Sequence, residues 1–562
     1  MRIDCVFIIS LAFLWIFVPS SLFAQYLPDN HYKTKNIRYV METIGNATGS
    51  IRGVPELKVS KNKKFIAEYA PHSKEIMVSE GFYDFCKGFG SDSLNALACI
   101  VGHELGHYYY DHDYSGGFNE ILGYKKDLKV SLENKKYIEA KADAFGLKYA
   151  YLGGFSSFSV YPGLLNKIYK RYKIVQNPGY PTKVQRIEIA ADQIKQIKPL
   201  IHALESALFL QVNGYSQESW LLYDYLLKND FISAEILNNM GAIRLSQALK
   251  LSATDELSDW FLYPCEIDPA ERLRAGLKQR AVNTETESRI FELQEAEKYL
   301  RDAVERNPRL YTARLNLTTV FILKEEFIAA QNQLNVIEGQ CKISGVKLPA
   351  NYYLLHGICL TMEEKFTEAK NYMELAKSNG AFEAVANLQS FYYYSKSYSE
   401  IISNIAISKI NYIKEYFWGN KPQPVIYKPL PVFETLKDDF SFKVLRSQTF
   451  DQTITNGMKQ TPFYLNFNEA KPGITKKKLE FADKTFYLIQ IDNKYAGVIP
   501  LGIKPGENIK KLEMLYGNPF WQLYNSVQNK YLVYRQSAKD NFGLFVETKN
   551  GIIKTMSFYY FD

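Results

Sequence analysis

The fold is decided by one stretch of the sequence, which runs from Asp92 to His112 and reads DSLNALACIVGHELGHYYYDH. It contains a His-Glu-x-x-His pattern. On an α-helix, residues four apart leave the same face one turn apart, so His103 and His107 can share one cation. Glu104 points to a neighbouring face, from which it reaches a metal-bound water rather than the metal. The spacing therefore predicts a metal site with two histidine ligands and Glu104 as the general base.

The residues around this pattern predict that the helix is buried. Apolar side chains recur through it, and Asp92 stands where the N-cap of a helix is expected. A buried helix that carries two imidazoles and a carboxylate needs a partner for them. The chain has seven histidines in 562 residues, so a surface pair or a chance match is a poor account of the spacing. The apolar positions are Leu94, Leu97, Ile100, Val101 and Leu105.

A catalytic zinc site needs a third protein ligand and one open position. Residues 137–146 predict a second helix, which carries Glu139 and Asp143 one turn apart on one face. Like charges repel at that spacing in an ordinary helix, and a cation with an imidazole N–H between them would remove the repulsion. Glu139 is then the third ligand, and Asp143 orients a ligand histidine. The alternative is an ordinary solvated helix face.

Three short strands are predicted before the central helix. Apolar residues alternate or cluster over strand lengths at 56–59, 65–70 and 75–78, with turn-forming residues between them. A strand edge beside a metal-binding helix is a place where a peptide substrate can dock by adding its own strand. The sequence thus predicts a substrate-binding edge next to the metal site.

The HELGH motif and the Glu-Ala-Lys-Ala-Asp run at 139–143 together resemble the HtpX and CAAX prenyl protease family of zinc metallopeptidases. His112 stands where that family often has a third histidine that is not a ligand. The resemblance covers about residues 50–195. It implies a mainly α-helical zincin-type peptidase domain with a small β-sheet over residues 25–200. It also implies one zinc ion (Zn2+) per chain, held by His103, His107 and Glu139 with Glu104 as the base.

The chain departs from that family at one place. The family usually follows the acidic helix with a histidine before a proline and an arginine six residues later, which together stabilise the oxyanion. Tyr180 replaces that histidine here, and Arg186 keeps the place of the arginine. Because a phenol can donate a hydrogen bond to a developing oxyanion, activity is still expected. The resemblance therefore implies Tyr180 and Arg186 as catalytic residues beside Glu104 and Asp143.

The start of the chain predicts export. Residues 1–24 combine a charged beginning, an apolar run and a cleavage position after Ala24, which is typical of a secretory signal. No later apolar stretch is long enough to span a membrane, so no transmembrane span is expected in the mature chain. The 68 basic and 60 acidic residues are scattered, and nothing indicates a nucleic-acid partner. Five cysteines follow the signal, so at least one thiol is unpaired: Cys86, Cys99, Cys265, Cys341 and Cys359.

Residues 201–410 change to paired amphipathic helices. Ala296, Leu300 and Ala303 match the small, large, small spacing of a tetratricopeptide repeat's second helix, and Ala330 follows Ala296 by 34 residues. The pattern resembles tetratricopeptide repeats, which usually bind other proteins through their concave face. The alternative is an array that only packs against the protease.

An insertion near 250–286 separates one predicted first helix from its partner. A zinc peptidase domain followed by such repeats resembles the architecture of the BepA-type periplasmic proteases. The resemblance implies envelope protein partners for the repeats.

A small α+β module is predicted over residues 420–562. Asn508 can cap a short helix, and strands are expected at 531–534, 543–546 and 552–560, the last two joined by an Asn550-Gly551 turn. No catalytic pattern occurs in this part of the sequence.

The sequence as a whole predicts a multidomain, secreted zinc metalloendopeptidase that cuts protein or peptide substrates. Its place is then the periplasm or the outer membrane of a Gram-negative bacterium, in envelope protein quality control or processing. The alternative is a periplasmic repeat scaffold or chaperone with weak or absent peptidase activity.

Overall fold

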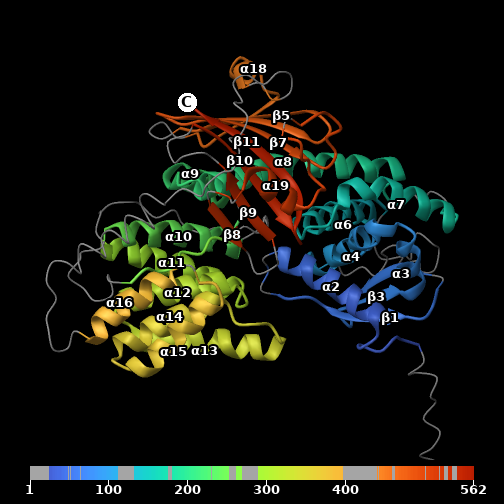
Figure 1. Cartoon of the computed structure of the whole chain (residues 1–562). Helices are drawn as coiled ribbons and strands as arrows, with labels where there is room; N and C mark the ends of the chain where they lie inside the picture. The colour runs from blue at the N-terminus through green and yellow to red at the C-terminus, as the bar shows by residue number, and fades with distance from the viewer. Residues whose placement is uncertain are drawn as a thin grey trace, which may run out of the picture. The chain divides into compact units, whose positions relative to one another are not determined.

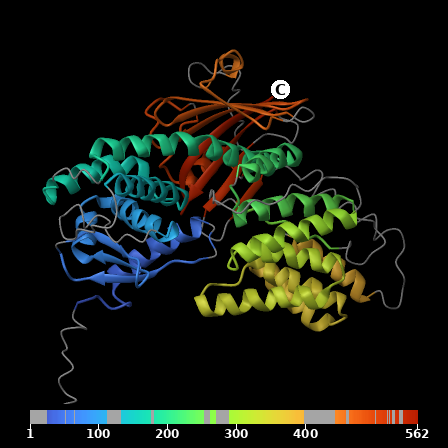
Figure 2. The same ribbon diagram turned by 180° about the vertical axis from the view of Figure 1, so that it is seen from behind.

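A computed structural model gives the fold as a multidomain, mainly helical chain with two β-sheets (Figures 1 and 2). The residues form two compact units that divide between Leu200 and Ile201. The predicted signal and most of the predicted insertion lie outside the described residues. The structure describes residues 25–111, 132–174, 180–251, 261–268, 289–396 and 440–562, apart from 49, 51, 64, 230, 382, 441, 458–461, 500, 518, 520, 525–528 and 535–540.

The first unit combines a three-stranded sheet with packed helices. The strand order is β1-β3-β2, with β1 parallel and β2 antiparallel to β3, so β2 lies at an edge. The three predicted strands are all present. The described elements are α2 (Tyr32–Ala47), β1 (Glu56–Ser60), β2 (Ala67–Ala70), β3 (Glu75–Ser79), α3 (Glu80–Lys87), α4 (Ser93–Tyr109), α6 (Leu132–Leu152), α7 (Ser157–Arg171) and the first part of α8 (Lys183–Val212).

Helix α4 lies at the centre of this unit and contacts α2, α3, α6, α7, β2 and β3. Its residues from Ala96 to Tyr108 are all buried, as the apolar pattern predicts. The predicted cap differs in detail. Asp92 occupies the N-cap position but makes no capping hydrogen bond, and its carboxylate accepts from the side chain of Asn95 at 2.8 Å. The reason is a 3₁₀ turn that leads directly into the helix and leaves Asp92 without the extended backbone of a capping residue.

Helices α4 and α6 approach closely because small residues line their crossing. A Cβ atom on Gly146 would lie 2.4 Å from the backbone nitrogen of His103, and one on Gly102 would lie 2.7 Å from the carbonyl oxygen of Gly146. A Cβ atom on Gly106 would lie 2.9 Å from the Cα atom of Ala142. Each contact is too short for a side chain. The glycines therefore allow the acidic face of α6 to reach the histidines of α4.

The second unit contains a helical array in which each helix contacts the next one along the chain. Alternate helices also touch, since α10 contacts α12 and α12 contacts α14. Figures 1 and 2 both show these helices side by side, which is the stacking expected of a helical repeat. The helices are α10 (Ala234–Lys250), α11 (Arg289–Arg306), α12 (Tyr311–Leu323), α13 (Phe327–Ser344), α14 (Ala350–Met362), α15 (Phe366–Ser378) and α16 (Ala384–Lys396).

Glycines also mark helix contacts in the array. A Cβ atom on Gly241 of α10 would lie 2.7 Å from Cγ of Leu300 on α11, and one on Gly357 of α14 would lie 2.7 Å from Cγ of Met373 on α15. Helix α11 is thus the packing partner of α10 across the insertion. Ala296 and the other small residues of the predicted repeat spacing are buried at these contacts.

The C-terminal part forms an antiparallel eight-stranded sheet in the order β4-β5-β6-β7-β11-β10-β9-β8. The sequence indicated only three of these strands by range, and in β6 three consecutive lysines interrupt the apolar pattern. The predicted turn is confirmed, with positive φ at Asn550 and Gly551. The predicted helix is confirmed as well, and the side chain of Asn508 caps it. The elements are β4 (Gln452–Thr455), β5 (Tyr464–Lys471), β6 (Ile474–Glu480), β7 (Thr485–Asp492), α19 (Ile509–Tyr516), β8 (Trp521–Tyr524), β9 (Asn529–Tyr534), β10 (Phe542–Lys549) and β11 (Ile552–Phe561).

The last part of α8 packs on this sheet. The ring of Phe209 contacts the rings of Phe545 and Tyr559. A buried ion pair joins Glu205 of α8 to Lys477 of β6. Helix α9 (Ser216–Lys228) also contacts the sheet, through aromatic rings at its start and along its length. The first helices after residue 200, which the sequence assigned to the repeats, therefore lie against the C-terminal sheet.

Two further observations concern the described residues as a whole. Their five cysteines are all free thiols, at 86, 99, 265, 341 and 359. None of their helices combines the length and the apolar character that crossing a membrane requires.

Candidate metal site

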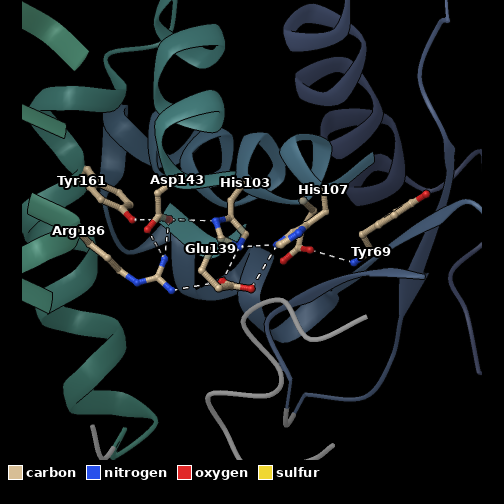
Figure 3. Close-up of polar contacts among 8 residues, drawn as sticks. Tyr69, His103, His107, Glu139, Asp143, Tyr161 and Arg186 are labelled. Atoms are coloured by element: carbon tan, nitrogen blue, oxygen red, sulfur yellow. Dashed lines mark hydrogen bonds and ion pairs between the residues drawn. The ribbon is translucent and has the colours of Figure 1, made fainter. Parts of the chain in front are cut away.

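Three buried side chains converge between α4 and α6 (Figure 3). Nε2 of His103 lies 3.2 Å from Nε2 of His107 and 3.2 Å from Oε2 of Glu139. Nε2 of His107 lies 3.5 Å from Oε1 of Glu139. Each residue offers one ligand atom, and the three atoms lie within 4.8 Å of one another. This group can hold a metal ion, and the structure brings together the three ligands that the sequence predicts.

Asp143 lies one turn beyond Glu139 on α6 and is the centre of a second layer of contacts. Its Oδ1 atom lies 2.9 Å from Nδ1 of His103 and accepts a hydrogen bond from the hydroxyl of Tyr161 at 2.9 Å. The guanidinium of Arg186 donates to both carboxylate oxygens at 2.5 Å (Figure 3). Asp143 thus fixes the ring of His103 through the nitrogen that faces away from the cluster.

The cluster holds opposite charges on fully buried side chains. Burial lowers the pKa of His103, but its hydrogen bonds to Asp143 and Glu139 outweigh that effect and raise the pKa to about 10. Burial raises the pKa of Glu139, but the hydrogen bond to His103 and the positive charges of His103, His107 and Arg186 outweigh it and lower the pKa to about 2. In the absence of a cation, a proton on His103 therefore balances the carboxylates. A bound cation would take over that role.

Glu104 points from α4 toward β2. Its Oε2 atom accepts a hydrogen bond from the backbone N–H of Tyr69 at 2.9 Å. Its Oε1 atom is buried and has no hydrogen-bond partner among the described residues. Burial raises the pKa of Glu104 to about 7 and outweighs the lowering by the charge of His103; the charge of Glu139 raises the pKa further, and the Tyr69 N–H lowers it slightly. A carboxylate with this pKa can accept and return a proton near neutral pH.

Two orphaned oxygens support the fit of a cation to this site. Oε1 of Glu104 and Oε1 of Glu139 are both buried without a hydrogen-bond partner among the described residues. A buried unpaired carboxylate oxygen costs free energy, so each needs an ion or a water. Two imidazoles and one carboxylate form a donor set that divalent transition metals accept. The residues therefore fit a metal ion by their chemistry as well as by their distances.

The two residues predicted to stabilise the oxyanion have different surroundings. Tyr180 is buried, and its assigned role stays a prediction. Arg186 is fully buried, and its guanidinium contacts Asp143 and, at 3.4 Å, Oε2 of Glu139. These contacts make Arg186 a residue that positions the acidic side chains of α6. The contacts that the structure shows for Arg186 do not include a position for an oxyanion, so that role also stays a prediction.

Sequence reasoning missed three parts of the site. The backbone N–H of Tyr69 carries no side-chain signal, so no pattern could indicate it. Tyr161 reads as an ordinary apolar position of α7, where it is buried. Gly146 was detectable, because a glycine inside a helix costs stability and needs a reason. His112 lies outside the described residues.

No family model matches this chain, and no curated protein matches it. The interpretation of the site therefore depends on its geometry and its chemistry.

Proposed function

We propose that this chain is a secreted zinc-dependent endopeptidase that hydrolyses peptide bonds of protein clients. The observation that carries the proposal is the buried group of His103, His107 and Glu139, with the carboxylate of Glu104 beside it on the same helix. A carboxylate with one oxygen free of hydrogen bonds among the described residues, next to three convergent ligands, is an arrangement suited to metal-assisted hydrolysis. When bound, zinc polarises a carbonyl and makes water acidic enough to lose a proton near neutral pH.

The chain's own residues divide the remaining work. The two histidines and Glu139 would hold the ion, and Asp143 keeps the ring of His103 in place. Oε2 of Glu104 is fixed by the Tyr69 N–H, so Oε1 is available to take a proton from water and return it to the leaving amine.

The substrate site in this proposal is the edge of the three-stranded sheet. Among the described strands β2 is the last of the sheet, next to β3, and its Tyr69 N–H donates to Glu104. A peptide that extends the sheet along β2 would therefore pass the base. Such docking reads the backbone of the substrate and suits protein clients of varied sequence.

The test is Glu104→Gln in the full chain. The amide keeps the shape of the side chain but cannot act as a base, so we expect hydrolysis of an unfolded protein substrate to fall by about 10²–10⁴-fold. Metal content should stay at that of the wild type, because Glu104 is not among the three ligands. Both quantities are measured on the same preparation, by peptide release and by elemental analysis.

Glu133→Gln is the matched control, because Glu133 is exposed near the start of α6 and lies outside the cluster. It should leave metal content and hydrolysis unchanged. Hydrolysis at the wild-type rate in Glu104→Gln would remove the assigned base and with it the proposal.

A second candidate function is a periplasmic scaffold or chaperone with weak or absent peptidase activity. The helical array favours it, because stacked helix pairs are typical of protein-binding surfaces. Under this reading Glu104→Gln retains the cellular function of the wild type, whereas under the enzyme reading it loses that function.

A further inference from the structure

One segment that belongs to no helix or strand, residues 261–268, lies among the helices of the array. It comes from the connection between α10 and α11, and its sequence is FLYPCEID. Phe261, Leu262, Tyr263 and Asp268 are all buried. Phe261 and Tyr263 belong to the same apolar core as the helices. The segment thus occupies the array as a bound peptide would.

Asparagine side chains hold the backbone of this segment at both ends. Oδ1 of Asn387 accepts from the N–H of Leu262 at 2.8 Å, and Nδ2 of Asn387 donates to the carbonyl of Leu262 at 2.8 Å. Asn239 makes the same pair with Asp268, at 2.7 Å and 2.8 Å. Each side-chain amide therefore forms hydrogen bonds with both the N–H and the C=O of one residue, as the backbone of a neighbouring β-strand would.

A third pair lies between these two. Oδ1 of Asn316 accepts from the N–H of Glu266 at 2.8 Å, and its Nδ2 donates to the carbonyl of Glu266 at 2.7 Å. Nδ2 of Asn238 donates to the same carbonyl at 3.1 Å. The side chain of Asn351 donates to the carboxylate of Glu266 at 2.9 Å. The middle of the segment is thus held through its backbone and through one acidic side chain.

Three of these asparagines each bind both the N–H and the carbonyl of one residue, and they form a row across the array. Asn239, Asn316 and Asn387 come from α10, α12 and α16, which are alternate helices of the stack. The segment crosses them in reverse order, because its start meets α16 and its end meets α10. All three are buried. We call this set the asparagine row.

The asparagine row offers the hydrogen-bond donors and acceptors that a binding site for an extended polypeptide needs. Six hydrogen bonds to backbone groups recognise any peptide in the right conformation, whatever its side chains. A buried asparagine that lost its partner would cost free energy, so the row needs an occupant at all times. A segment of the same chain satisfies that need without competing for a partner, and a segment of another protein has the same backbone groups.

We propose that the asparagine row is a binding site for an extended polypeptide segment, and that residues 261–268 fill it as a built-in occupant which a partner segment displaces. The partner has apolar side chains at its start and an acidic side chain toward its end, like Phe261, Leu262 and Glu266. This inference deepens the client-binding part of the proposed function and does not depend on hydrolysis.

The test measures binding of a labelled peptide that carries the sequence of residues 261–268, with Cys265→Ser to prevent oxidation. Fluorescence anisotropy is read with the full chain in the Glu104→Gln background, so cleavage of the probe does not enter. Replacing residues 261–268 in the chain by eight glycine and serine residues should open the row, and the peptide should then bind at least about tenfold more tightly than to the intact chain.

Two substitutions should shift the affinity in opposite directions. Leu262→Pro in the chain removes the N–H that Asn387 accepts, so it loosens the built-in segment and strengthens binding of the free peptide. Asn316→Asp in the opened chain replaces a donor by a charged acceptor that faces the peptide carbonyl, so it weakens binding by about tenfold. If the substitutions only damaged the fold, both variants would bind the free peptide more weakly.

N-methylated versions of the probe peptide test whether the site recognises the peptide through its backbone N–H groups. N-methylation at the position of Leu262 or Glu266 removes a hydrogen-bond donor and should abolish binding. N-methylation at the position of Ile267, whose N–H has no bond to the row, should have a much smaller effect. Equal binding of all N-methylated peptides would overturn the proposal.

Two other outcomes would also overturn it. One is an opened chain that keeps the wild-type circular dichroism spectrum but binds no peptide. The other is loss of the helical fold on opening, which would make residues 261–268 an integral part of the core. Loss of hydrolysis by the wild-type chain would leave this test unaffected, so the two proposals fail separately.

Discussion

The metal site of the first unit and the asparagine row of the second are both buried polar clusters between packed helices, but they differ in charge. The metal site joins His103, Glu139, Asp143 and Arg186, and two of its carboxylate oxygens have no hydrogen-bond partner among the described residues. The asparagine row is neutral, and each of its amides is paired in both directions with one backbone residue. The acidic oxygens of the first cluster need a positive partner, whereas the amides of the second need a partner with both hydrogen-bond donors and acceptors.

This difference indicates what each cluster binds. Charged groups taken out of water need an opposite charge, so the first cluster suits a cation. Amides need donors and acceptors in equal number, which a peptide backbone supplies. Four experiments test whether the charge of each cluster sets what it binds.

The largest expected effect is loss of the metal. His107→Ala removes one of three ligands, and we expect metal content to fall from about one ion per chain to nearly none, with hydrolysis lost as well. Elemental analysis after dialysis measures the first quantity. His356→Ala in α14 is a suitable control, because the ring of His356 contacts the ring of Tyr372 in the array and is not part of the cluster. Full metal content in His107→Ala would show that the first cluster does not bind the metal, and the contrast with the asparagine row would then be wrong.

The second experiment compares one helix crossing of the first unit with one of the helical array. Gly146→Ala places a methyl group against the backbone of α4, which cannot move aside, so we expect unfolding to become easier by about 3 kcal/mol. Gly357→Ala meets mainly the flexible side chain of Met373 and should cost about 1 kcal/mol. Gly163→Ala on α7 meets no atom within 4 Å and should stabilise by about 0.5–1 kcal/mol. Denaturant titration gives all three values, and equal costs for the first two would refute this explanation of the crossing.

The third experiment exchanges charge and amide at matched positions. Asp143→Asn keeps the shape but removes the charge that faces His103 and Arg186, so metal affinity should fall by about 10–100-fold. Asn316→Asp does the reverse in the asparagine row and should destabilise the chain by about 2 kcal/mol, because a carboxylate would face the carbonyl of Glu266. Competition with a chelator measures the first effect and thermal unfolding the second. A neutral outcome in both would mean that charge does not set the binding preference.

The smallest expected effect is a pH dependence in the second unit. Burial raises the pKa of Glu205, but the charge of Lys477 and the contact with His202 outweigh burial and lower the pKa to about 2. A lowered pKa means that the ion pair stabilises the fold above the ordinary glutamate pKa of about 4.5. That contribution, on the order of 2 kcal/mol, is lost as the pH falls from about 5 to 2. Unfolding curves between pH 6 and 3 should show a smaller decline in Glu205→Gln than in the wild type, and identical declines would argue against the assignment.

Much of the candidate metal site was predictable, because its signals are local. The four-residue spacing of His103 and His107 and the same spacing of Glu139 and Asp143 each place two side chains on one helix face. Their convergence was a hypothesis that needed a reason for the two helices to meet. That reason lies in Gly102, whose contact with α6 no spacing rule describes.

The roles within the site were less predictable. Arg186 fits a family pattern as an oxyanion residue, yet in the folded chain its guanidinium contacts the carboxylates of Asp143 and Glu139. A buried guanidinium pairs with the opposite charges that lie nearest to it, and here these are the carboxylates of Asp143 and Glu139 on α6. Sequence spacing contains no information about this pairing.

The larger sheet was only partly predictable for a related reason. Strand β6 contains three consecutive lysines, which a period-two apolar pattern rejects. Lys477 is nevertheless buried, because Glu205 from a helix distant in the sequence neutralises it. A sequence pattern that classes each residue only as apolar or polar cannot show that a distant glutamate will neutralise a buried lysine.

The sequence by itself determined the features that depend on neighbours a few residues apart. These are the buried helix with its two histidines, the acidic pair that follows it, the paired helices of the array and the turn at Asn550. Two features depend on the tertiary structure. One is the pairing of Arg186 with the carboxylates of Asp143 and Glu139. The other is the set of hydrogen bonds by which asparagines from three helices bind residues 261–268. The physical reason is that helix periodicity is written into successive residues, whereas a hydrogen bond across the fold depends on where two distant backbones come to lie.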